Sequence, residues 1–284
     1  MSASNSDPVV VGVDGSDCAL GAVRWAARTA VLRGASLQVV YAMSSGWDLG
    51  RAGIVSIDDQ SFRDAGDVAV ARAASIAVAE AAPRHLDVET SVVSPGPVAA
   101  LRRRARHAQL LAVGTRGLGT FERTLLGSVS TALARRPLCP LAVIPQPGHP
   151  ASDRLPVLVG LDGSPGSEHA LDIAIEEAAR RGVGLVALRA WGEPAPGLRE
   201  SQMTEHTHRL LGDTLVGYGE KYPGVPITRI VTGDDPAQRL LRESARAQLL
   251  VLGSHRRGER DGFGSVSRTV LHATEIPLIV LDRR

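Results

Sequence analysis

Cysteine is nearly absent from this sequence, whose 284 residues include only Cys18 and Cys139. Two cysteines are too few for a disulfide scaffold or for a metal site built from thiolates. We interpret both as packing thiols, one before an expected helix and one beside an expected strand. His206 and His208 are two apart, so on a helix they point to different faces. We expect no metal site and interpret both histidines as surface residues.

Lysine is also scarce, because the 32 basic residues include a single lysine, Lys221, which stands between Glu220 and Tyr222. The phosphate loop of P-loop NTPases needs a lysine between a glycine and a serine or threonine. The sequence therefore excludes a P-loop NTPase. The net charge of +2 gives no indication of nucleic-acid binding.

Long hydrophobic runs are missing as well. The sequence has no stretch of about 18 uninterrupted apolar residues, and its N-terminus lacks a basic segment followed by an apolar one. A composition of 44% hydrophobic and 22% charged residues is typical of a globular protein. We expect a cytoplasmic protein with neither a membrane nor a nucleic acid among its partners.

Glycine is plentiful and is arranged in a pattern. Gly114-Thr115-Arg116-Gly117 follows an apolar run, and nine residues later comes Gly127-Ser128-Val129-Ser130. Glycine lets a ligand approach the main chain, and the N–H groups at a helix N-terminus attract anions. The acid of Asp14-Gly15-Ser16 follows another apolar run, where its carboxylate can accept bonds from ribose hydroxyls. Together the two motifs predict a nucleotide site.

The same arrangement occurs twice along the chain. Asp14-Gly15-Ser16 recurs 148 residues later as Asp162-Gly163-Ser164, Gly114 pairs with Gly253 at an offset of 139, and Gly127 pairs with Gly264 at an offset of 137. A period of this size is that of a whole domain rather than of a solenoid repeat. We predict two tandem domains, 1–147 and 148–284, joined by a proline-rich linker.

Segments typical of strands and helices alternate within each copy. In the first copy we expect strands at Val9–Val13, Leu37–Tyr41, Val88–Val93, Leu110–Val113 and Leu138–Ile144, and helices after the first strand, near 64–82, from Pro97 and from Ser128. This alternation predicts an α/β fold with a parallel, doubly wound sheet. Ligands of such sheets bind at the carboxyl ends of strands where the winding reverses. If the first and fourth strands are neighbours, Asp14 and Gly114 face one crevice.

With these motifs the chain resembles, over nearly its entire length, the nucleotide-binding branch of the universal stress protein family. The resemblance implies two Rossmann-like domains, each with a five-stranded sheet in the order 3-2-1-4-5. It implies ATP as cofactor, with Mg²⁺ as an optional companion, and a role in stress response or signalling without efficient turnover. The implied nucleotide-binding residues of the first domain are Asp14, Gly15, Ser16, Ala42, Gly114, Gly117, Gly127, Ser128, Val129 and Ser130. Those of the second are Asp162, Gly163, Ser164, Ala190, Gly253, Gly264, Ser265, Val266 and Ser267.

The second copy departs from the motif in its glycine loop. Arg256 stands where the second glycine is expected, and the loop is two residues shorter. Two possibilities follow: an arginine replaces part of the backbone contact to phosphate, or the second domain is an empty structural copy.

Plainer interpretations of the same residues stay open. Asp14 and Asp162 also suit helix capping, and Ser128 suits a plain N-cap. Trp191 follows Ala190 and is interpreted as a packing residue, with pocket lining as the alternative. Four arginines share an expected helix with Leu101 and Ala105 and are interpreted as its solvated face: Arg102, Arg103, Arg104 and Arg106.

Two other functions also remain open. One is slow ATP hydrolysis or adenylyl transfer, for which Arg116 and Arg123 are the nearest candidate cations of the first loop. The other is a dimerisation module without nucleotide, which pairs through the apolar terminal strands Leu138–Ile144 and Leu278–Leu281. We expect a homodimer formed through these strands.

Overall fold

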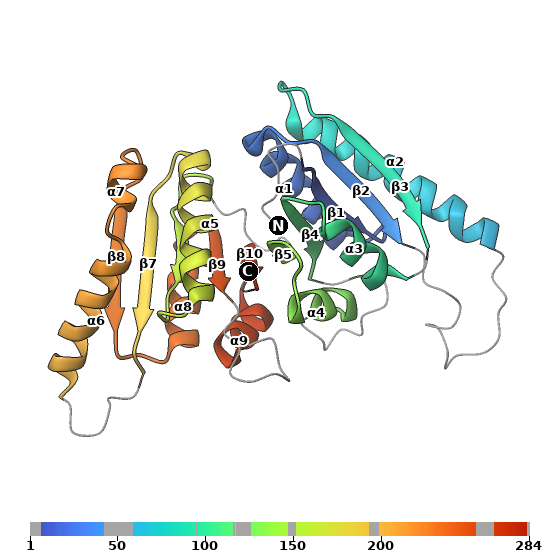
Figure 1. Cartoon of the computed structure of the whole chain (residues 1–284). Coiled ribbons are helices and arrows are strands. Elements are labelled where there is room, and N and C mark those ends of the chain that lie inside the picture. Colours follow the sequence, from blue (N-terminus) through green and yellow to red (C-terminus); the bar gives the residue numbers. More distant parts are fainter. Residues whose placement is uncertain are drawn as a thin grey trace. The chain divides into compact units, whose positions relative to one another are not determined.

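The chain divides into two compact units, Met1–Pro147 and Gly148–Arg284 (Figure 1). The computed structural model describes residues 7–42, 59–94, 96–115, 117, 126–146, 152–192, 199–253 and 264–282, with the backbone alone at 59–62. Strands and helices alternate in both units, and all described strand pairs within a unit are parallel. The predicted α/β class is confirmed.

In the first unit the strands lie in the order β3-β2-β1-β4-β5. The elements in chain order are β1 (Val9–Val13), α1 (Asp17–Arg33), β2 (Leu37–Ala42), α2 (Asp59–Ala81), β3 (Val88–Val93), α3 (Pro97–Ala105), β4 (Leu110–Gly114), α4 (Ser128–Arg135) and β5 (Leu141–Ile144). Helices α1 and α2 lie behind the strands and α3 and α4 in front of them in Figure 1. The predicted order 3-2-1-4-5 is therefore confirmed.

The second unit repeats this order as β8-β7-β6-β9-β10. Its elements are β6 (Val157–Gly160), α5 (Pro165–Arg181), β7 (Leu185–Ala190), α6 (Glu200–Thr214), α7 (Tyr218–Lys221), β8 (Ile227–Thr232), α8 (Pro236–Ser244), β9 (Leu249–Gly253), α9 (Ser265–Ala273) and β10 (Leu278–Leu281). In both units the strand that carries the aspartate motif is central, with the glycine strand beside it.

Local sequence explains the ends of the first helix of each unit. Ser16 is the N-cap of α1, and its side chain accepts a hydrogen bond from the backbone N–H of Ala19. The helix ends at Gly34, whose left-handed φ of 63° suits glycine. Ser164 is likewise the N-cap of α5, and Gly182 ends that helix with a left-handed φ of 65°. These caps fix where the chain leaves the strand and thus where the preceding aspartate stands.

The hydrophobic core of each unit lies on both faces of its strands. Residues 9–11 of β1 and 157–159 of β6 are fully buried, because helices cover both sides of these central strands. Both cysteines are buried, as their interpretation as packing thiols requires. Cys18, however, lies inside the first turn of α1 rather than before that helix.

The last strand of the first unit is shorter than predicted. The sequence predicts a strand from Leu138, whereas β5 begins at Leu141. Proline has no N–H to donate to a neighbouring strand, and the pairing of β5 with β4 starts directly after Pro140. The residues directly before β5 form a bend instead of a strand, and Leu138 in this bend is partly exposed.

No helix in the described part of the chain combines the length and the hydropathy that crossing a membrane requires.

Candidate functional site

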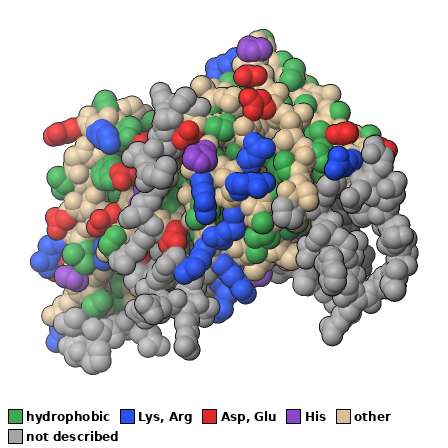
Figure 2. All heavy atoms as spheres, turned by 45° about the vertical axis from the view of Figure 1, so that its right-hand side comes forward, with side chains coloured by type: hydrophobic (Ala, Val, Ile, Leu, Met, Phe, Trp, Pro, Cys, Tyr) green, Lys and Arg blue, Asp and Glu red, His purple; other side chains and the backbone are tan. Residues whose placement is uncertain are grey.

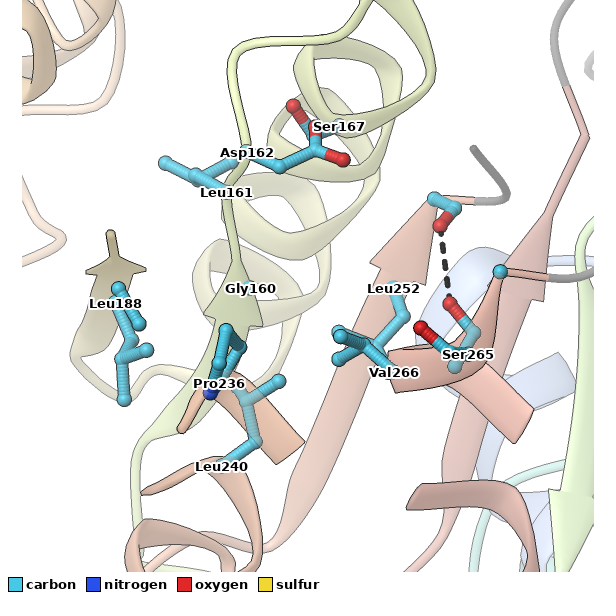
Figure 3. Close-up of a pocket in the computed structure, with 14 residues that line it drawn as sticks. Gly160, Leu161, Asp162, Ser167, Leu188, Pro236, Leu240, Leu252, Ser265 and Val266 are labelled. Atoms are coloured by element: carbon cyan, nitrogen blue, oxygen red, sulfur yellow. Dashed lines mark hydrogen bonds between the residues drawn. The ribbon is translucent and has the colours of Figure 1, made fainter. Parts of the chain in front are cut away.

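A cavity of about 510 Å³ lies at the carboxyl ends of the central strands of the second unit (Figure 3). Strand β6 has β7 on one side and β9 on the other, so the winding of the sheet reverses between β6 and β9. Ligands bind at this position in doubly wound sheets. The volume falls within the range of about 300–1,000 Å³ that is typical of small-molecule sites.

Most of the residues predicted for the second domain line this cavity. They are Asp162, Ala190, Gly253, Gly264, Ser265, Val266 and Ser267. Gly163 and Ser164 are not among the lining residues and instead shape the turn that leads into α5. Gly163 has a left-handed φ of 81°, and Ser164 Oγ accepts a hydrogen bond from the backbone N–H of Ser167 at 3.2 Å. The structure thus gives these two residues a positioning role.

Sequence reasoning missed the apolar part of the lining. It consists of Gly160, Leu161, Leu188, Pro236, Leu240 and Leu252, with Ser167 as a further polar residue. One signal was available, since Pro236 and Leu240 are four apart on α8 and therefore share a helix face. Figure 3 shows Leu188 and Leu240 on one side of the cavity and Val266 on the other. An apolar hollow of this kind suits a flat ring system.

The glycine at the end of each glycine strand permits a close approach of the chain. A Cβ atom on Gly253 would overlap the carbonyl oxygen of Gly166 in the first turn of α5. In the first domain a Cβ atom on Gly114 would stand 2.8 Å from Sγ of Cys18. Any side chain here would push the first helix away from the strand end. These two glycines therefore let the first helix of each domain pack directly against the end of the glycine strand.

The aspartates hold the turn that precedes the first helix. In the second domain Oδ1 of Asp162 accepts a hydrogen bond from the N–H of Ser164 at 2.8 Å. In the first domain Oδ1 of Asp14 accepts bonds from the N–H of Ser16 at 3.0 Å and from its Oγ at 2.7 Å. The N-caps are the serines, so the alternative that the aspartates cap the helices is wrong.

The helices after the glycine loops begin without a side-chain cap. Gly127 is the N-cap of α4 and Gly264 that of α9, and neither helix has a capping side chain. The interpretation of Ser128 as an N-cap is therefore wrong, because Ser128 is the first helical residue. Since N–H groups of a first helical turn have no partner within the helix, these two N-termini are suited to an anion.

The third residue of each of these helices ties the helix to the strand. Ser130 Oγ donates to the carbonyl oxygens of Gly127 at 3.0 Å and Thr115 at 3.2 Å. In the second domain Ser267 Oγ donates to the carbonyl oxygen of Gly253 at 3.4 Å, as Figure 3 shows. Both hydroxyls thus hold a helix N-terminus next to the end of the glycine strand.

Similar residues surround the aspartate of the first domain, with one difference in charge. Gly117 lies against Asp14, because a Cβ atom on Gly117 would overlap Oδ2 of that carboxylate. Burial raises the pKa of the Tyr41 phenol, and the charge of Asp14 raises it further, so this group is neutral at pH 7. In β7 the residue equivalent to Tyr41 is Arg189. A Cβ atom on Gly163 would stand 2.7 Å from the guanidinium group of Arg189, which therefore lies beside the turn after Asp162.

Trp191, His206 and His208 lie outside the cavity. Trp191 packs with its ring against Gly233 and does not line the cavity. His206 and His208 are exposed on α6, in agreement with their interpretation as surface residues. Within the described residues no group of three or more His, Cys, Asp and Glu could hold a metal ion. The loop residues Arg116, Arg123 and Arg256 lie outside the described part of the chain.

The fold defines a tandem pair of doubly wound α/β domains, with a cavity at the switch point of the second. The chain belongs to the universal stress protein family, whose family model matches residues 5–145 and 154–282. It is similar to a universal stress protein of Mycobacterium tuberculosis H37Rv, with 40% identity over 294 residues and 96% of each chain covered.

The fold agrees with that of one solved structure over nearly the whole chain. A universal stress protein from Archaeoglobus fulgidus superposes with a TM-score of 0.73 at 20% identity, over 98% of this chain and 96% of its own. Another universal stress protein, crystallised in complex with cAMP, is 32% identical, covers 50% of this chain and 98% of its own, and has a TM-score of 0.39.

Proposed function

We propose that this universal stress protein binds an adenine mononucleotide, ATP, in the cavity of the second domain and at the equivalent residues of the first. The observation that carries the proposal is the arrangement of three chemically different surfaces around one cavity. Asp162 supplies an acceptor for ribose hydroxyls, the uncapped start of α9 supplies N–H donors for phosphate, and leucine side chains supply an apolar hollow for the base. ATP contains a partner for each.

The residues present in the cavity fit a binding role rather than fast catalysis. Among the described lining residues Asp162 is the only ionisable one. Efficient phosphoryl transfer needs a positioned base together with a cationic clamp. We infer that nucleotide occupancy, and not its turnover, is what the protein contributes to the stress response.

The proposal is tested by calorimetric titration of the full chain with ATP and with NAD. ATP should bind at micromolar concentration, which corresponds to about 8 kcal/mol, and NAD at least tenfold more weakly because one aspartate and one helix N-terminus suit a single nucleotide. A hundredfold excess of ATP over the dissociation constant should stabilise the fold by about 2.7 kcal/mol. Equal heats for NAD and ATP, or no heat for either, would contradict the proposal.

A matched pair of variants assigns the binding to each domain. Ala190→Trp places a bulky ring at a lining position at the end of β7, and Ala42→Trp does the same at the equivalent end of β2. Each variant should remove one of two binding steps and leave the other. If neither variant changes the titration, the nucleotide binds elsewhere. If only Ala42→Trp changes it, the second domain is an empty structural copy.

A further inference from the structure

Six arginines gather on one face of the first domain, which we name the arginine face. Four lie on α3 and at its C-terminal end and two at the end of α4: Arg102, Arg103, Arg104, Arg106, Arg135 and Arg136. Helices α3 and α4 pack against each other, so these side chains form one surface. Figure 2 shows Lys and Arg side chains gathered across the middle of the visible face.

The arginines of this face have no acidic partner among the residues that the structure describes. Within the part of the chain that the structure describes, none of the six guanidinium groups takes part in an ion pair. Arg102 donates to the backbone carbonyl of Arg136 at 3.3 Å, which satisfies a donor but leaves the charge unpaired. Basic residues in the last turn stabilise a helix through its dipole, which amounts to about half a charge per helix end. That effect does not account for six positive charges.

The same face of the second domain shows that the fold does not require this charge. There Arg239 of α8 pairs with Asp234 at 3.0 Å and with Glu243 at 2.9 Å, and Arg242 lies 3.6 Å from Asp234. In the alignment of the repeats Glu243 stands at the position of Arg104. The second domain thus pairs Arg239 and Arg242 with acidic neighbours, whereas the six arginines of the first domain have no such pair among the described residues.

We propose that the arginine face docks a short acidic segment of a partner protein. The planar guanidinium group matches a carboxylate through two parallel hydrogen bonds, which favours arginine over lysine at such a surface. At the edge of the face lies Leu138, whose side chain is 39% exposed. An apolar side chain within an acidic segment can pack on Leu138 while its neighbours bind the guanidinium groups.

The composition of the face favours protein over nucleic acid. Single-stranded nucleic acids are bound by aromatic side chains that stack on the bases, and the described residues of α3 and α4 include no aromatic residue. Proteins that bind duplexes carry a basic footprint over much of a domain, but this chain has a net charge of +2. The positive charge is local, as a short peptide partner requires.

The test uses the full chain and a fluorescent peptide of alternating Asp and Glu with one central Leu. A length of about ten residues reaches about 33 Å when extended and so spans both helix ends. We expect saturable binding by fluorescence anisotropy, weakened about tenfold between about 0.05 M and about 0.5 M salt, because exposed charges are screened. Absence of saturable binding at low salt would overturn the proposal.

Two double variants locate the binding. Arg103→Ala with Arg106→Ala removes two exposed charges from the arginine face, whereas Arg242→Ala with Arg246→Ala removes two exposed charges from the second domain. We expect the first pair to weaken peptide binding about tenfold and the second to change it less than twofold. Alanine is the best helix former, so both variants should keep the fold, which circular dichroism checks. Equal losses in the two pairs would show that binding follows net charge alone.

Competition identifies the class of partner. Unlabelled acidic peptide should displace the probe at lower concentration than duplex DNA of equal total charge or vesicles of phosphatidylserine and phosphatidylcholine. Stronger competition by DNA or by vesicles would overturn the assignment to a protein segment. Arg103 and Arg106 lie at the C-terminal end of α3, which leads into the start of β4, whereas the glycine loop follows the opposite end of that strand. ATP binding should therefore stay unchanged in both double variants.

Discussion

Gly117 lies so close to Asp14 that a Cβ atom on Gly117 would overlap Oδ2 of the carboxylate. The glycine loop and the aspartate motif of the first domain therefore lie in direct contact, although about a hundred residues separate them in the sequence. Any side chain at position 117 must displace either the loop or the carboxylate. The first prediction follows from this contact.

Gly117→Ala should weaken ATP binding to the first domain at least tenfold, because the methyl group displaces the acceptor for the ribose hydroxyls. The matched control is Gly219→Ala in α7, where a Cβ atom meets nothing within 4 Å and which should leave binding unchanged. Calorimetric titration of both variants in the Ala190→Trp background isolates the first site. Unchanged affinity in Gly117→Ala would show that Asp14 does not contact the ligand.

Gly127→Val and Gly264→Val test the two uncapped helix N-termini. A branched side chain at the N-cap stands where phosphate should approach the backbone donors of α4 or α9. Each variant should remove one binding step and cost about 1 kcal/mol of folding stability, since valine is a poor N-cap. Titration counts the sites, and urea unfolding measures the stability. Retention of both binding steps would show that phosphate binds elsewhere.

The strand order and the place of the crevice were predictable because they depend on residues with few alternatives. Asp14 and Gly114 end two apolar runs, and the parallel pairing of β1 with β4 brings those ends together. The start of β5 was not predictable from hydrophobicity, because the run from Leu138 continues through Pro140, which cannot join the ladder.

The apolar part of the cavity escaped prediction for a different reason. Leu240 and Leu252 look in the sequence like any other core leucines, and only packing shows that a hollow remains between them. The form of the second glycine loop around Arg256 lies outside the described residues. Its compensating arginine and the pairing of two copies through their terminal strands stay predictions.

Tyr218→Phe should lower the stability of the second domain by about 0.5 kcal/mol at pH 7. The phenol donates a 2.7 Å hydrogen bond to Oδ1 of Asp172, and the site is partly exposed. Burial, this bond and the charge of Asp172 raise the pKa of Tyr218 above its ordinary value of 10.0. Because the neutral form is the one stabilised, the contribution is fully present below pH 10 and is lost as the pH rises towards the folded-state pKa.

Urea unfolding of wild type and Tyr218→Phe at several pH values from about 7 to about 11 measures this loss. The difference between the two proteins should be constant up to about pH 9 and shrink above it. Tyr41→Phe in the first domain is the control, because its phenol has a raised pKa from burial and the charge of Asp14 and does not contact Tyr218 or Asp172. A difference that grows with pH would contradict the assigned direction of the pKa shift.

Arg181→Ala should destabilise the second domain more than any other single arginine replacement on α5. The side chain of Glu177 is only 1% exposed, and Arg181, 11% exposed, binds its Oε2 through two nitrogens at 3.0 Å and 2.9 Å. Arg181→Ala takes two charge-assisted hydrogen bonds away from a buried carboxylate, which costs about 3 kcal/mol. Arg180 contacts the same carboxylate at 3.8 Å but is 32% exposed, so Arg180→Ala should cost less than about 1 kcal/mol.

The equivalent of Glu177 in the first domain is Thr29, so the fold itself does not require a charge at this position. Glu177→Leu combined with Arg181→Met replaces the pair by apolar side chains of similar volume. The double variant should therefore be more stable than Arg181→Ala by at least 2 kcal/mol, because no charge stays buried without its partner. Urea unfolding of the four proteins gives the comparison. If Arg181→Ala and Arg180→Ala cost the same, the ion pair of Arg181 with Glu177 is not what stabilises this helix.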